Sequence, residues 1–184
     1  LLIPDLTPSD LQRVTHTYAR QFASWTHRAL PLRVSRSHSG ERLRIGYLSA
    51  DFHQHATAYL TAGVFEHHDP REFESHAYSY GPDDGSATRQ RLLNAFEQFV
   101  DIRGLDHAAA AQRIRDDDID ILVDLKGYTR QARPEILAQR PAPIQVNWLG
   151  YPGTMAVDFM DYIIVDTTVA PPEEASAYQE ALAY

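Results

Sequence analysis

The first part of the chain has apolar residues at spacings of three and four, the period of a helix with one buried face. The members of this stripe are Leu11, Val14, Tyr18, Phe22 and Trp25. Thr7 can cap such a helix, Pro8 suits its first position, and Asp10 stands three residues after the cap. We predict a helix that begins at Pro8, buries this stripe and ends before Pro31, followed by a polar linker at 35–41.

From residue 43 the pattern changes to short apolar runs that alternate with helical segments. The strands are predicted at 43–49, 73–80, 99–102, 119–125, 143–149 and 162–166. The helices between them are predicted at 58–67, 86–96, 108–115 and 132–139, with another opening at Pro171. The run at 119–124 is almost continuously apolar, as expected of a central strand covered on both faces. The alternation predicts an α/β fold, a Rossmann-like, doubly wound and mostly parallel sheet preceded by a linking helix.

Composition narrows the class of protein. The 184 residues are 43% hydrophobic and 23% charged, the balance of a globular domain. The formal charge of -8 argues against nucleic-acid and anionic-membrane partners, which need a basic field. The absence of cysteine excludes disulfides and thiol catalysis, and we expect a cytoplasmic protein without a secretory signal. Arginine greatly outnumbers lysine, which indicates a bacterial source, and the missing initiator methionine suggests a piece of a longer polypeptide.

Three loops after predicted strands carry candidate chemistry, because open α/β sheets bind ligands beyond the carboxyl ends of their strands. The first runs from Asp51 to Thr57 and holds a carboxylate, two imidazoles and a hydroxyl before a helix N-terminus. These groups suit acid-base work and anion binding. A metal site would compete for His53 and His55, but alternate residues of an extended segment point in opposite directions. Polar residues that only cap the next helix are the third interpretation.

The second loop, 126–133, places three cations around a tyrosine, with Gly127 free to adopt an unusual backbone angle. It suits a phosphate or a peptide, or it is a solvated basic turn. The third loop, 148–154, is a rigid turn of glycines and proline between aromatic residues. His16 stands apart from these loops, off the apolar stripe of the first helix. There is no phosphate-binding Walker loop and no dinucleotide fingerprint after the first strand.

Read in order, several strings resemble the catalytic region of the protein O-GlcNAc transferases, glycosyltransferase family 41. They are Leu-Arg-Ile-Gly-Tyr-Leu-Ser-Ala-Asp-Phe at 43–52, Gly-Tyr-Thr at 127–129, Arg-Pro-Ala-Pro-Ile-Gln at 140–145 and Trp-Leu-Gly-Tyr-Pro-Gly-Thr at 148–154. The resemblance runs from about residue 10 to the last residue. It implies that residues 41–184 are the N-terminal lobe of a GT-B enzyme. Residues 1–40 would then join that lobe to upstream tetratricopeptide repeats.

The resemblance also implies a reaction. An inverting transferase would move N-acetylglucosamine from UDP-GlcNAc to serine or threonine hydroxyls of a protein or peptide acceptor. Neither metal nor other cofactor is expected, and a C-terminal lobe of the same polypeptide would hold most of the UDP.

Site residues follow from the matching strings. The resemblance makes His16, His55 and Asp51 the catalytic candidates for receiving the proton of the acceptor hydroxyl, alongside the α-phosphate of the donor itself. The expected donor-binding residues are Thr57, Leu149, Gly150 and Pro152, and the expected acceptor-binding residues are Tyr128 and Arg133.

This chain departs from the family pattern at three positions. Ala56 replaces the usual proline, Tyr59 replaces a common histidine, and Arg130 stands where animal members have lysine. These departures affect acceptor choice. The alternatives are a protein O-fucosyltransferase of the same family that uses GDP-fucose, or a non-catalytic peptide-binding module on the same fold.

Overall fold

A computed structural model describes residues 7–27 and 42–184 of the chain. The N-terminal segment is helical, as predicted, and its start has the predicted cap. Helix α1 spans Pro8–Ala19. The Thr7 hydroxyl accepts the Asp10 backbone N–H, and the Asp10 carboxylate accepts the Thr7 backbone N–H in turn. The helix does not continue smoothly: the short turn η1 (Arg20–Phe22) and helix α2 (Ala23–Thr26) follow. Pro31 and the predicted linker lie outside the described residues.

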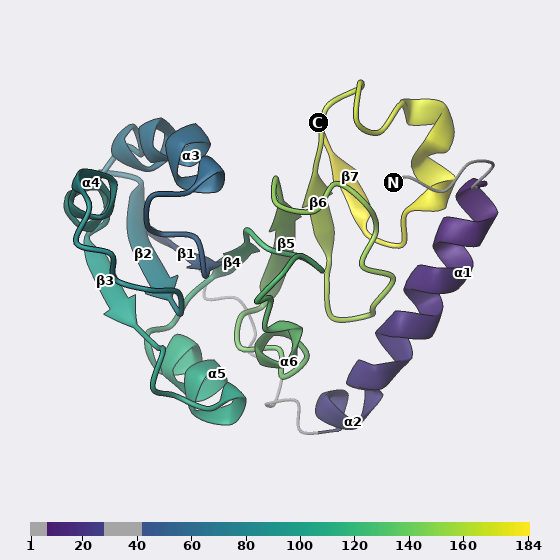
Figure 1. The fold of residues 1–184 in the computed structure, drawn as a ribbon, viewed down its shortest axis with the longest axis horizontal. Helices are drawn as coiled ribbons and strands as arrows, with labels where there is room; N and C mark the ends of the chain where they lie inside the picture. Colours follow the sequence, from purple (N-terminus) through teal and green to yellow (C-terminus); the bar gives the residue numbers. More distant parts are fainter. Residues whose placement is uncertain (1–6, 28–41) are drawn as a thin grey trace.

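The predicted buried stripe of this helix is wrong for two of its members. Val14 is 60% exposed and Tyr18 is 49% exposed. Phe22 of the stripe is buried as predicted, and Thr15 and Ala19, which are not members of the stripe, are buried as well. The helix lies along one end of the sheet (Figure 1), and only its inward edge meets the core, so part of the apolar stripe remains at the surface.

Seven parallel strands form one sheet in the order β3-β2-β1-β4-β5-β6-β7. Their bounds are β1 Leu43–Ser49, β2 Phe73–Ser79, β3 Gln98–Asp101, β4 Ile121–Asp124, β5 Ile144–Trp148, β6 Tyr162–Ile164 and β7 Ala181–Ala183. The strand order runs outward in both directions from the β1–β4 pair, which is the switch point of a doubly wound sheet. The predicted Rossmann-like α/β class is confirmed, and the last strand, β7, is one that the sequence pattern did not predict.

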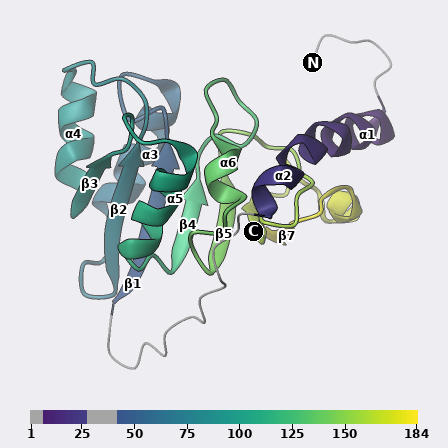
Figure 2. The same ribbon diagram turned by 90° about the horizontal axis from the view of Figure 1, so that it is seen from below.

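Helices cover both faces of the sheet (Figures 1 and 2). Their bounds are α3 Ala56–Glu66, α4 Ala87–Ala95, α5 His107–Asp116 and α6 Pro134–Leu137. Helices α3 and α4 contribute side chains to one core with Tyr47 and Val123, whereas α5, α6 and η1 contribute to another with Leu48 and Leu122. Neighbouring residues of one strand thus enter opposite cores, because successive side chains point to opposite faces. The segment predicted to open a helix at Pro171 forms a 3-10 turn, η2 (Pro172–Ala177).

Candidate active site at the carboxyl ends of the strands

The loops after β1 and β4 meet at one edge of the sheet. Leu48 of β1 pairs with Asp124 of β4, so the residues just beyond these positions become neighbours. Asp51 follows β1 and Lys126 follows β4, and the Lys126 ammonium donates to Asp51 Oδ2 at 2.7 Å. Both side chains are almost fully buried. The switch point of the sheet thus contains a buried ion pair whose partners lie 75 residues apart in the sequence.

Asp51 is the centre of this cluster. Besides the ammonium, its Oδ2 has the Thr57 hydroxyl at 3.5 Å and the His55 Nδ1 at 3.5 Å. Its backbone N–H donates to the Ser49 hydroxyl. The structure therefore brings together three residues of the first candidate loop, Asp51, His55 and Thr57, around one carboxylate oxygen.

His55 begins helix α3 as its N-cap residue. Its Nδ1 accepts the backbone N–H of Thr57 at 3.2 Å, which satisfies one of the free donors at the helix start. The side chain is nevertheless 41% exposed, so the ring is open to a ligand on its other side. Capping and a chemical role were alternatives in the sequence, and the geometry permits both at this residue.

Asp124 is a second buried carboxylate beside the pair. It accepts the backbone N–H groups of Gly127 at 2.7 Å and Lys126 at 3.2 Å, and so shapes the turn after β4. Burial raises the pKa of Asp124 to about 7, with the Asp51 charge acting in the same direction and the two backbone N–H groups and Lys126 opposing it. Gly127 has a φ of 50°, a left-handed angle of the unusual kind that glycine permits. The Lys126 ammonium thus pairs with Asp51, and its charge also acts on the nearby Asp124 carboxylate.

Tyr80 and Arg133 lie next to these charges. The Tyr80 hydroxyl is buried. Burial raises its pKa well above the ordinary value, and Asp124 and Asp51 add to that shift. The Arg133 guanidinium lies 5.6 Å from the centre of the Tyr80 ring and donates to the carbonyl oxygens of Ile102 and Leu105. Two donors of Arg133 are therefore engaged by the chain itself, and its expected contact with an acceptor stays a prediction.

The loop at 149–154 passes over the end of β4. Leu149 has a φ of 70°, a left-handed conformation that a branched side chain seldom adopts. A Cβ on Gly150 would lie 2.0 Å from the Leu125 carbonyl oxygen, so only glycine permits this approach. Leu149 and Pro152 line a hollow of about 300 Å³ with Trp148, Ile164, Val165, Asp166 and Val169. Three of the four expected donor-binding residues thus belong to one strained loop with an adjacent apolar hollow.

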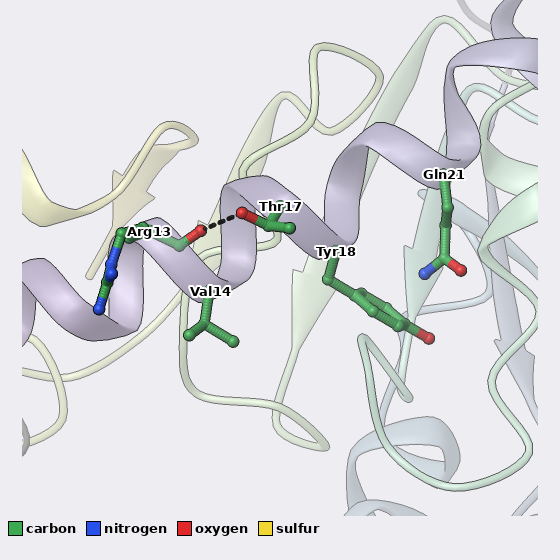
Figure 3. Close-up of a pocket in the computed structure, with 5 residues that line it drawn as sticks. All are labelled: Arg13, Val14, Thr17, Tyr18 and Gln21. Carbon is green, nitrogen blue, oxygen red and sulfur yellow. Dashed lines mark hydrogen bonds between the residues drawn. The ribbon is translucent and has the colours of Figure 1, made fainter.

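Tyr128 joins the strand-end loops to the N-terminal helix. Its hydroxyl donates to the Met155 carbonyl oxygen at 2.7 Å. Its ring meets Tyr18 edge-on with centroids 4.8 Å apart and stacks on Phe22 at 5.9 Å. Beyond Tyr18 the exposed face of α1 borders an open hollow that Arg13, Val14, Thr17 and Gln21 also line (Figure 3). Tyr128 is thus a packing residue of this structure, and its expected contact with an acceptor stays a prediction.

His16 is exposed on α1 and lines a different cavity from the Asp51 cluster. This cavity, of about 500 Å³, lies between the N-terminal helices and residues 156–159, and Gln179 also borders it. Neither His55 nor Asp51 lines it. The structure therefore brings three of the predicted catalytic and donor-binding residues together around Asp51 and places His16 at a separate site.

Lys126, the partner of Asp51, and Asp124, the carboxylate near them, were not predicted from the sequence to lie beside Asp51. One signal was available, because Lys126 is the only lysine in a chain with 17 basic residues. A single lysine among arginines at a strand end indicates a place where a compact ammonium is needed.

Within the described residues, no group of three or more histidine, aspartate or glutamate side chains could hold a metal ion. Nor does any helix described for this chain have the length and apolar character to cross a bilayer.

Comparisons with known proteins agree on one family. The sequence profile of glycosyl transferase family 41 matches residues 22–184. The UDP-N-acetylglucosamine--peptide N-acetylglucosaminyltransferase of Caenorhabditis elegans is 46% identical over 147 residues, which cover 79% of this chain and 13% of the relative. The probable UDP-N-acetylglucosamine--peptide N-acetylglucosaminyltransferase SEC of Arabidopsis thaliana is 40% identical, over 87% of this chain and 16% of the relative.

The fold comparison agrees with the sequence comparisons. A structure of a mutant O-GlcNAc transferase from Thermobaculum terrenum superimposes with a TM-score of 0.90 at 31% identity. The match covers 98% of this chain and 34% of that one. The chain thus spans about a third of that structure and less than a fifth of the two curated relatives. Its sheet and flanking helices correspond to one lobe of a GT-B enzyme, and the chain belongs to glycosyl transferase family 41.

Proposed function

We propose that this chain is the first lobe of an inverting glycosyltransferase that moves N-acetylglucosamine from UDP-GlcNAc to serine or threonine hydroxyls of a protein acceptor. The observation that carries the proposal is the Asp51–His55–Thr57 cluster, which lies at the switch point of a family 41 lobe. The names of the two relatives describe, for those proteins, transfer of N-acetylglucosamine from UDP-N-acetylglucosamine to a peptide. The protein would act in the cytoplasm, together with a second lobe of the same polypeptide.

In this scheme the acceptor hydroxyl approaches the sugar beside His55. Its oxygen forms a bond to the anomeric carbon, the bond from that carbon to UDP breaks, and UDP leaves with the electron pair. The hydroxyl proton passes to a base, for which His16, His55, Asp51 and the donor phosphate are the candidates. The loop at 149–154 would hold the donor for in-line attack, which is a matter of positioning. No step calls on a metal ion.

The test is release of UDP from UDP-GlcNAc by the full-length protein that carries this chain, with a peptide acceptor. We expect His55→Ala to lower turnover by about 100-fold or more, the usual contribution of a positioned polar group. His67→Ala is a matched control, because His67 is an exposed imidazole at the opposite end of α3. His16→Ala tests the second cavity, and circular dichroism verifies that each variant is folded. Full turnover in both His55→Ala and His16→Ala would contradict the assigned site.

The donor and the class of protein are tested in the same assay. Activity with GDP-fucose and none with UDP-GlcNAc would assign the protein to fucose transfer. Silence with both donors, together with peptide binding by the full-length protein, would favour a binding module on this fold.

A further inference from the structure

His55 Nδ1 lies between two groups that make opposite demands on it. The Thr57 backbone N–H points at this nitrogen from 3.2 Å and requires a lone pair there. Asp51 Oδ2, 3.5 Å away, requires a proton there. One nitrogen cannot satisfy both groups at once, so the choice between them decides which neutral form of the imidazole is present.

Two features of the site favour the lone pair on Nδ1. The first is the start of helix α3, whose free N–H groups carry partial positive charge and disfavour a proton on the capping nitrogen. The second is Lys126, whose ammonium is only 2.7 Å from the same oxygen that would accept from Nδ1. A carboxylate with a close cation is a weaker acceptor for a third group than a carboxylate without one, because charge strengthens a hydrogen bond.

We propose that Lys126 is a positioning residue for His55: by occupying Asp51 Oδ2, it keeps the proton of the neutral imidazole on Nε2. Nε2 lies across the ring from the Asp51 and Thr57 contacts, on a side chain that is 41% exposed. His55 then presents an N–H donor to a ligand, whereas without Lys126 it would present a lone pair.

The consequence for the reaction rests on the proposed function. An Nε2–H group hydrogen-bonds an oxygen of the acceptor or donor, but it cannot take the proton of the acceptor hydroxyl. His55 therefore orients a substrate oxygen, and the base is one of the other candidates. Asp124 is the other charged group near Lys126, and each of its two oxygens already accepts a backbone N–H group. The ammonium is therefore directed at Asp51.

The experiment reads the tautomer directly and needs no turnover. The full-length protein is labelled with ¹³C at the Cδ2 carbon of histidine, whose chemical shift separates the two neutral forms. The resonance of His55 is assigned by its loss in His55→Gln. Spectra are recorded at alkaline pH, where imidazoles are neutral. We expect the wild-type signal at the Nε2–H position and the Lys126→Met signal at the Nδ1–H position.

Two further variants separate this effect from a general loss of structure. Lys126→Met combined with Asp51→Asn removes both charges, so the His55 signal should return to the Nε2–H position. Arg71→Met is the matched control, because it removes an exposed cation two residues before β2 begins, and it should leave the signal unmoved.

A wild-type signal at the Nδ1–H position would overturn the proposal by itself, even if Lys126→Met fails to fold. An unmoved signal in folded Lys126→Met would also overturn it, because Lys126 would then have only a structural role. In the turnover assay Lys126→Met should lower kcat more than it raises the donor KM. A wild-type protein without turnover with either UDP-GlcNAc or GDP-fucose would contradict the proposed function, but the tautomer result would still stand.

Discussion

The buried ion pair between Lys126 and Asp51 allows a quantitative prediction for Lys126→Met. Methionine has a similar length but no charge, so the change leaves the Asp51 carboxylate buried without its cation. At 2.7 Å and an effective dielectric constant of about 20, the lost attraction is about 6 kcal/mol before any compensation. Removal of one partner of a buried pair costs about 3–5 kcal/mol in practice, because the protein relaxes and water enters.

Asp124 should reduce that cost. Burial raises the pKa of Asp124 to about 7, and the Asp51 charge adds to this, whereas the two backbone N–H groups and the Lys126 charge lower it. Removal of the ammonium raises this pKa further, so Asp124 takes up a proton at neutral pH and the repulsion between the two carboxylates disappears. We therefore expect a loss near the lower end of the range, about 3 kcal/mol.

The measurement is native-state hydrogen exchange of the full-length protein, read at peptides that cover β1 and β4, because exchange reports the free energy of local opening. Lys126→Met with Asp51→Asn should lose less than about 2 kcal/mol, since no unpaired charge remains. A loss below about 1 kcal/mol in Lys126→Met, or an equal loss in the single and double variants, would show that Asp51 does not depend on the ammonium for its stability.

Three further predictions concern stability, each measured by urea unfolding of the same protein. The raised pKa of Asp124 means that the folded state binds more protons than the unfolded chain between pH 3.8 and about 7. The contribution of Asp124 to the free energy of unfolding is therefore present in full below that window and lost as the pH rises through it. Asp124→Asn should flatten the dependence of the free energy of unfolding on pH in this window. An unchanged dependence would contradict the raised pKa of Asp124. Gly150→Ala should cost about 2–3 kcal/mol, because its Cβ meets the Leu125 carbonyl oxygen, and a neutral result would contradict that geometry. Phe22→Ala should cost about 3 kcal/mol, because Phe22 is buried, and exposed Val14→Ala should cost less than about 0.5 kcal/mol. Equal losses would show that Val14 is buried too, as the stripe predicted.

Much of the fold could be predicted from periodicity and capping. The strand predicted at 43–49 agrees with β1 at both ends, and the helix that Thr7 was expected to cap has that cap. The exposure of Val14 and Tyr18 could not be predicted, because the stripe only says which residues share a helix face. Which part of that face meets the sheet depends on how the helix lies across the lobe.

In the site, too, the contacts between residues close in sequence could be predicted, and the contacts between distant residues could not. Asp51, His55 and Thr57 are close in sequence, so a strand followed by a helix start was enough to predict their proximity. The contact between Asp51 and Lys126 depends on β1 and β4 being neighbours, and no local pattern specifies strand order. Hydrophobic periodicity describes elements one at a time, whereas a buried charge pair belongs to the arrangement of the whole sheet.

The position of the β1–β4 pair also bears on how the lobe folds. Strands β1, β2 and β3 and the helices between them could associate early, since they are consecutive in the chain. The pairing of β1 with β4 requires a much longer loop closure, which is entropically slower. Until it forms, Asp51 and Lys126 are separate ions in solvent, and the buried ion pair of the site is missing. The loop-closure argument therefore makes this ion pair a late product of folding, and a chain divided between β3 and β4 would carry one of its two residues on each fragment.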